Sequence, residues 1–350
     1  MTTPPKTARR APMVVLGVAG ILMLLVTATA CGQATPAGST APAGGGLPLT
    51  AVTAVPLPGD TGRVDYASLD PAAHRLFIAH LGASQVIEVD TTTNQVVNVI
   101  DNIPGVHGVL VVPELHRVFA TATTSNEVLT LDEDTGTVLS RAPTGDYPDG
   151  LAYAPSSHRV WVTNETGGTE TVLDTTNGQI VGTVDVGGDA GNVAYDPAGR
   201  RILVAVQSRD QVVVIDQTTL TITQRVDIPG CDHPHGLALD PDHRVGFVAC
   251  DGNATLHTLD LDTYQTSNPL KVGDTPDVLA YDPGMGRLYV AAESGTVTVL
   301  AENNRQLTVL GSGHLADDAH VVAVDPATHR SYYPIAQGPD DHPQILVQAP

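Results

Sequence analysis

A proline that recurs at nearly equal intervals restricts the fold of this chain more than any other feature. Its seven copies, most of them preceded by Asp and followed after a short spacer by Arg, are Pro71, Pro113, Pro155, Pro197, Pro241, Pro283 and Pro326. The successive spacings are 42, 42, 42, 44, 42 and 43 residues. A regular period of this length indicates one structural unit repeated along the chain and stacked against its own copies, so we expect a single repeat domain.

Each repeat has the pattern of four short β-strands. In the third copy, an alternating run at 150–153 precedes the proline, a second strand is expected at 159–163, and a turn rich in Asp, Thr, Asn and Gly leads to a strand at 180–186. Asp-Pro favours a tight turn because proline fixes φ and the Asp side chain accepts hydrogen bonds from the turn backbone. The chain shows almost no helical periodicity. The sequence therefore predicts an all-β, seven-bladed β-propeller with four antiparallel strands per blade.

The two ends of the repeat region predict how the ring closes. The seventh repeat holds only three strands before Pro350, and the segment 50–57, ahead of the first repeat, has the pattern of a fourth. We expect this N-terminal strand to complete blade seven, so that the propeller domain covers residues 49–350. Closure of this kind protects the edges of the sheets.

The N-terminus has the pattern of an export signal over residues 1–30. Basic residues precede an apolar run at 13–30, which ends in small residues directly before Cys31. This arrangement resembles the bacterial lipobox, and the resemblance implies that Cys31 is lipidated and becomes the mature N-terminus. An uncleaved transmembrane anchor is the alternative, because the run is about long enough to span a bilayer. Either route predicts that the remainder is extracytoplasmic and held at the cell membrane.

Composition and charge limit the partners. Residues 31–48 are rich in Gly, Pro, Ala, Ser and Thr and predict a flexible linker. The formal net charge of −21 argues against nucleic acid as a ligand. The lipid is expected to supply the membrane contact, and a small molecule, a cation or a protein remains open as the partner. We expect a monomer.

One strand motif carries a resemblance to a known family. The run Val160-Trp-Val-Thr-Asn164 resembles the naming motif of the YVTN-type β-propeller repeat family (YncE-like proteins), and the similarity extends over residues 50–350. The resemblance implies the propeller fold. It leaves the function open, because such propellers include binding proteins and enzymes.

A ring of Asp and His is expected at the mouth of the central channel. Six residues before the seven prolines stand Asp65, His107, Asp149, Gly191, His235, Asp277 and His320. The loops between second and third strands are expected on the same face, and they add His80, Asn164, Glu165, Gln207, Asp251 and Glu293. A solvated polar funnel that binds a ligand, a metal or catalytic site, and polar groups packed between blades are the alternatives. His233 is expected near the mouth but outside the ring.

The metal alternative rests on three histidines. His107, His235 and His320 have the side chains to hold one divalent ion, with a loose similarity in ligand type to the zinc site of propeller-type amidating lyases. An Asp or Glu of the funnel would then be the base of a lyase or hydrolase. A second set of histidines recurs in the Asp-Pro turns and is interpreted as a structural turn element: His74, His116, His158, His243 and His329.

The two cysteines beyond Cys31 flank one predicted hairpin. Folding the first two strands of blade five about their turn brings Cys250 near Cys231. In an oxidising compartment this predicts a disulfide. Taken together, the sequence favours a cell-surface, lipid-anchored binding propeller with an unidentified ligand. A metal-dependent lyase or hydrolase and a protein-interaction scaffold remain alternatives, so enzymatic activity stays open.

Overall fold

The computed structural model describes residues 46–338 and 341–350. The predicted signal peptide, Cys31 and nearly all of the predicted linker lie outside these residues. The described residues belong to one compact unit, Pro42–Pro350. Within them, no helix is long and apolar enough to cross a membrane.

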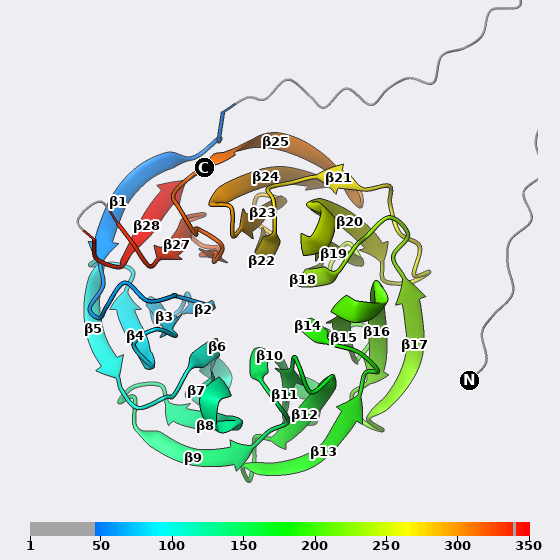
Figure 1. The fold of residues 1–350 in the computed structure, drawn as a ribbon, viewed down its shortest axis with the longest axis horizontal. Helices are drawn as coiled ribbons and strands as arrows, with labels where there is room; N and C mark the ends of the chain where they lie inside the picture. Colours follow the sequence, from blue (N-terminus) through cyan, green and yellow to red (C-terminus); the bar gives the residue numbers. More distant parts are fainter. Residues whose placement is uncertain (1–45, 339–340) are drawn as a thin grey trace, which may run out of the picture. The chain divides into compact units, whose positions relative to one another are not determined.

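Seven four-stranded antiparallel sheets surround a common axis, with the first strand of each blade innermost (Figure 1). Blades one to three are β2 (Ala67–Asp70), β3 (Arg75–His80), β4 (Gln85–Asp90), β5 (Gln95–Ile100); β6 (Val106–Val112), β7 (Arg117–Ala122), β8 (Glu127–Asp132), β9 (Val138–Pro143); and β10 (Pro148–Ala154), β11 (Arg159–Asn164), β12 (Thr169–Asp174), β13 (Gln179–Asp185). Blades four to six are β14 (Ala190–Asp196), β15 (Arg201–Val206), β16 (Gln211–Asp216), β17 (Thr221–Asp227); β18 (Pro234–Asp240), β19 (Val245–Cys250), β20 (Thr255–Asp260), β21 (Leu270–Lys271); and β22 (Pro276–Asp282), β23 (Arg287–Ala292), β24 (Thr296–Asn303), β25 (Gln306–His314). The predicted seven-bladed propeller is confirmed.

Blade seven is built from both ends of the chain. It contains β26 (Ala323–Val324), β27 (Ser331–Ile335), β28 (Gln344–Ala349) and the N-terminal strand β1 (Thr50–Pro56), which pairs antiparallel with β28. In β1 only Val55 is buried, and it joins a core cluster with Ile345 and Val347 of β28. The predicted closure by the N-terminal strand is therefore present in the structure.

Short 3-10 helices occupy several connections on the two faces. η1 (Pro113–Leu115) and η3 (Pro155–Ser157) lie in turns between first and second strands, and η2 (Thr123–Ser125), η4 (Gln207–Arg209) and η5 (Asp251–Asn253) lie in loops between second and third strands. Because successive strands run in opposite directions, these two sets of connections are on opposite faces of the ring.

The Asp-Pro turns follow one geometry that explains most of their histidines. The Asp side chain accepts hydrogen bonds from the turn, as Asp70 does from the backbone N–H groups of Ala72 and Ala73. The third residue after every proline then has a positive φ, a conformation that Asn, Asp and His tolerate better than bulky residues. These residues are His74, His116, His158, Arg200, Arg244, Gly286 and His329.

His243 departs from this pattern, which corrects the sequence interpretation. It stands one residue earlier in its turn than the other four histidines, and Arg244 takes the positive φ instead. The His243 ring lies 2.7 Å from Asp240 and 3.4 Å from Glu302. Its role is a side-chain contact between blades five and six, and not the backbone conformation of the turn.

A β-bulge near the start of the innermost strands directs side chains toward the channel. In blades two to six the pairing register shifts by one residue between the first and fourth residues of these strands, as between Pro148 and Leu151. In blade one, the N–H of Asp65 bonds to Ala79 O, and the N–H of Ala79 bonds to Tyr66 O, which is the same arrangement. A bulge interrupts the two-residue alternation and re-aims the bulged side chain.

Ring closure makes the whole domain sensitive to one side chain of β1. We predict that Val55→Asp lowers the free energy of unfolding by at least about 2 kcal/mol, because it buries a charge without a partner. Val52→Asp, on the same strand but 42% exposed, should change it by less than about 0.5 kcal/mol. Denaturation followed by the fluorescence of Trp161, which is fully buried in blade three, measures both. Equal stabilities of the two variants would contradict the closure role of Val55.

Candidate functional site

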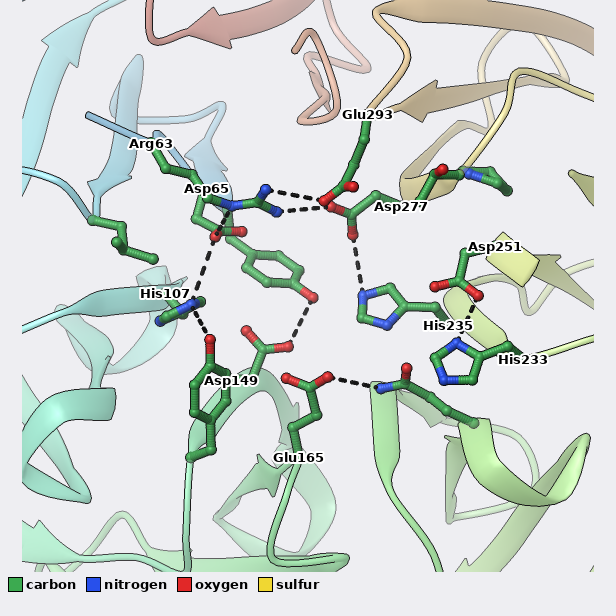
Figure 2. A pocket seen from close by; sticks show the side chains of 16 residues that line it. Arg63, Asp65, His107, Asp149, Glu165, His233, His235, Asp251, Asp277 and Glu293 are labelled. Atoms are coloured by element: carbon green, nitrogen blue, oxygen red, sulfur yellow. Dashed lines mark hydrogen bonds and ion pairs between the residues drawn. The ribbon is translucent and has the colours of Figure 1, made fainter. Parts of the chain in front are cut away.

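A cavity of about 490 Å³ opens at one end of the central channel and is lined by side chains from blades one to six (Figure 2). Its lining residues occupy three repeated positions of the sequence, with Tyr66 and Pro276 in addition. The inner ring, six residues before the prolines, contributes Asp65, His107, Asp149, His235 and Asp277. The outer ring, eight before, contributes Arg63, Tyr147, His233 and Thr275. The loop ring, ten after, contributes Leu81, Glu165, Gln207, Asp251 and Glu293.

The bulge determines where the inner ring points. Strict alternation along the first strand would put these residues on the face that packs against the neighbouring blade. The extra residue of the bulge breaks the alternation, and the side chains face the channel instead. The blades approach closely here: a Cβ at Gly108, the other bulge residue of blade two, would collide with the backbone oxygen of Asp149 in blade three. The polar side chains are therefore held on a closely packed backbone.

The loop ring contains all but two of the loop residues that the sequence suggested for this face. His80 and Asn164 each stand one residue too early, at the ends of β3 and β11, and both side chains are fully buried. Leu81 takes the cavity position in blade one. The alternation of a strand places neighbouring residues on opposite sides, which accounts for the difference.

The outer ring was not predicted as a set. Sequence reasoning missed Arg63, Tyr147 and Thr275, which all line the cavity. His233, expected near the mouth but outside the inner ring, lines the cavity from the outer ring. Tyr147, His233 and Thr275 share a positive φ, near 60°. Alignment of the seven repeats on their prolines carries the signal, since this position varies between blades and is polar in six of them.

Arg63 connects blades one and six through three carboxylates. Its guanidinium lies 3.0 Å from Asp65, 3.5 Å from Asp277 and 3.0 Å from Glu293. Although burial lowers the pKa of Arg63, these carboxylates more than compensate and raise it above its usual value. This side of the cavity therefore already contains its own cation.

His235 and Asp277 form a second ion pair, with Nε2 and Oδ1 3.1 Å apart. Burial opposes protonation of the imidazole, but the hydrogen bond and charge of Asp277 prevail and raise the pKa of His235 to about 10. Burial likewise opposes ionisation of Asp277, yet the hydrogen bond from His235 holds the pKa of Asp277 below its ordinary value. At neutral pH the pair is an imidazolium next to a carboxylate.

Asp149 is in a different electrostatic environment on the opposite side of the cavity. Burial, reinforced by the charge of Asp65, raises the pKa of Asp149 well above its ordinary value. One of its carboxylate oxygens lies 3.3 Å from the hydroxyl of Tyr66, which also bonds to the side-chain oxygen of Asn192. Tyr66 thus crosses from blade one to blades three and four.

Tyr66 lies between two cavities of the channel. It lines the funnel cavity and also a second cavity of about 310 Å³ between the innermost strands, and it is the residue that the two linings share. The bulge position that it occupies is Gly in blades two, three and five. Burial and Asp149 raise the pKa of Tyr66 well above its ordinary value, which keeps the hydroxyl protonated.

His107 is oriented by two hydrogen bonds. Its Nδ1 donates to the backbone oxygen of Gly105 at 3.0 Å, and Nε2 accepts from the hydroxyl of Tyr147 at 3.1 Å. The two rings lie with their centroids 5.0 Å apart. Tyr147 is 38% exposed and presents an aromatic surface at the cavity rim.

His320 does not join the other inner-ring residues at the cavity surface. Its side chain is 1% exposed, Nδ1 lies 3.0 Å from Asp318, and Nε2 has no hydrogen-bond partner among the described residues. Burial opposes protonation, but Asp318 outweighs this effect and raises the pKa of His320 to about 9. Blade seven has only a two-residue inner strand, β26, which lacks the regular bulge geometry of the other blades.

The three histidines expected to hold a metal are not gathered around one point. Within the described residues, one group of His, Cys, Asp and Glu ligand atoms lies within 4.8 Å of one another, namely Asp240, His243 and Glu302. That group is on the face of the Asp-Pro turns. His107, His235 and His320 are not part of it, and His235 is engaged by Asp277.

Cys231 and Cys250 are joined by a disulfide, with their Cα atoms 5.5 Å apart. Pro234 pairs with Cys250 in the hairpin, so the disulfide holds the loop that carries His233 against β19. His233 in turn lies 2.6 Å from Asp251 of the loop ring. A crosslink across this sequence separation contributes on the order of 3 kcal/mol to stability.

Comparisons with known proteins identify the fold and no family. No protein-family model matches the sequence, and no curated protein matches it. Among solved structures, a chain of Kuenenia stuttgartiensis hydrazine synthase is similar, with a TM-score of 0.71 and 15% sequence identity. The similarity covers 80% of this chain and 94% of that chain. At this identity the likeness shows the β-propeller fold alone.

The pairing of His235 with Asp277 can be tested by titration. We predict that NMR of the imidazole nitrogens finds His235 protonated through pH 8 in the native protein. In Asp277→Asn the pKa of His235 should fall by at least about two units, because burial then acts without the compensating carboxylate. The exposed substitution Asp134→Asn, on the opposite face, should leave the titration unchanged. Titration of native His235 near its ordinary value would refute the pair.

Proposed function

We propose that this protein is an extracytoplasmic β-propeller that binds a small polar ligand in the cavity at its channel mouth. The observation that carries the proposal is the convergence of charged and polar side chains from six blades on one cavity of about 490 Å³. Its size is in the range of ligand pockets. Hydrogen bonds and ion pairs between blades hold these groups in place, so a ligand would meet a site that is largely preformed.

The geometry favours this function over the two alternatives. A metal-dependent lyase or hydrolase would need ligand atoms around a common point, and the funnel histidines within the described residues do not provide them. A scaffold that uses only outer strands would leave the funnel without a role. The concentration of polar side chains in the funnel is better explained by a ligand that enters the channel mouth.

Attachment to the cell membrane is part of the proposal. The lipobox-like sequence before Cys31 supports export and lipidation, and the run Val160-Trp-Val-Thr-Asn164 supports a relationship with the YVTN-type (YncE-like) propellers. An anchored binding protein would hold its ligand site at the cell surface. The negative charge of the chain would attract cationic solutes to it.

Lipid attachment predicts a simple labelling result. Cells that express the full chain and are fed a radiolabelled fatty acid should yield labelled protein in the membrane fraction. Cys31→Ala should remove the label, because the thiol is the proposed acceptor. Cys231→Ser, which breaks the disulfide and leaves Cys250 as a free thiol, should retain it. Absence of label in the native chain would exclude lipidation.

Ligand binding predicts a thermal shift that depends on access to the cavity. We expect at least one class in a panel of polar cations, anions, sugars and amino acids to raise the melting temperature of the purified protein, since a ligand at 100 times its Kd adds about 2.7 kcal/mol. Leu81→Trp, which fills the cavity without changing its charge, should abolish the shift. Leu310→Trp, at a 40% exposed position on β25, should preserve it. No shift with any class, or equal shifts in both variants, would refute the funnel as the binding site.

A further inference from the structure

The carboxylates of the funnel divide into two groups that differ in their partners. On the side of blades one, five and six, the carboxylates have nitrogen partners. Asp65, Asp277 and Glu293 contact the Arg63 guanidinium, Asp277 also contacts His235, and Asp251 lies 2.6 Å from His233. On the side of blade three, Glu165 and Asp149 have neutral partners (Figure 2). The cationic partners of the funnel carboxylates are therefore confined to one side of the cavity.

The partners of the second group are an amide and a hydroxyl. Glu165 accepts a hydrogen bond of 3.2 Å from the side-chain amide of Gln207, and Asp149 contacts Tyr66 at 3.3 Å. Among the described residues, no Lys, Arg or His nitrogen lies within 4.0 Å of either carboxylate. Burial and the charge of Asp65 raise the pKa of Asp149, and the more distant His235 imidazolium offsets this only in part.

We infer that the ligand of the funnel is a small organic cation whose ammonium or guanidinium group binds between Glu165 and Asp149. The inference rests on the proposed function and specifies its ligand class. Arg63 provides the internal precedent, because it shows a planar cation held by carboxylates within the same cavity. A ligand cation between Glu165 and Asp149 would be held by carboxylates on the other side of the cavity, as Arg63 is on its own side.

The surroundings fit an organic cation better than a bare metal ion. Tyr147 lies at the rim with an exposed ring, and aromatic rings attract ammonium and guanidinium groups over their faces. Among the described residues, the funnel carboxylates do not form a group of three ligand atoms within 4.8 Å. They are thus too widely spaced to enclose a metal ion, while hydrogen-bonding groups several bonds apart on an organic molecule can reach them separately.

Calorimetry with matched probes tests the inference. Putrescine, 1,4-butanediol and adipate share a spacer of four methylene groups and differ in their end groups, and agmatine is a further cation that carries a guanidinium group. We expect putrescine or agmatine to bind the purified full chain with one site, and butanediol and adipate not to bind. The affinity should fall with added salt, because charges at the cavity mouth are screened. Binding by adipate or butanediol without the cations would overturn the cation class and leave the proposed funnel function standing.

A variant locates the cation. Glu165→Gln keeps the size and the hydrogen bond acceptor but removes the charge, and it should weaken binding of the cationic probe at least about tenfold. Asp134→Asn removes the same charge from the opposite face and should change the affinity less than about twofold. If both variants lose affinity equally, the loss reflects the net charge of the protein, and the proposed site between Glu165 and Asp149 is wrong. No binding of either cation by the native protein would also overturn the inference, and the wider thermal-shift panel then decides the funnel function separately.

Discussion

The pairing of β1 with β28 is the constraint on which the rest of the molecule depends. Seven sheets can surround an axis only if the last meets the first, and here the two ends of the described domain form one sheet. The position of every innermost strand follows from that closed ring. Arg63, for example, can reach Asp277 and Glu293 only because blades one and six are held at the separation that the intervening blade seven sets.

The sequence was sufficient for the architecture because proline, aspartate and alternating apolar residues act locally and recur in each blade. The same repeat placed the inner ring and Glu165, Gln207, Asp251 and Glu293 on one face. The repeat did not predict where the side chains point at the β-bulge, because the two-residue alternation of the strand is broken there. The bulge is a property of pairing between two strands, and a single strand sequence does not reveal which residue is the extra one.

Other differences have equally specific causes. His80 is expected in the loop between the second and third strands, but it is the last residue of β3, and Leu81 takes the cavity position. His320 stands at the right repeat position, but blade seven has only a short first strand and buries it. Arg63 and Tyr147 occupy a position whose residue type varies from blade to blade, so neither composition nor a motif drew attention to them. The position of a residue within the repeat therefore predicts whether it lines the funnel better than its residue type does.

Tyr66 gives the channel a property that the propeller ring alone does not have. Its side chain crosses the axis to Asp149 and Asn192 and lines both the funnel cavity and the second cavity, so it lies between them. A solute in the funnel cavity would rest against the Tyr66 side chain, and a solute in the second cavity would meet the same side chain from the other face of the ring. One aromatic residue then sets how far a molecule can enter the channel from either end.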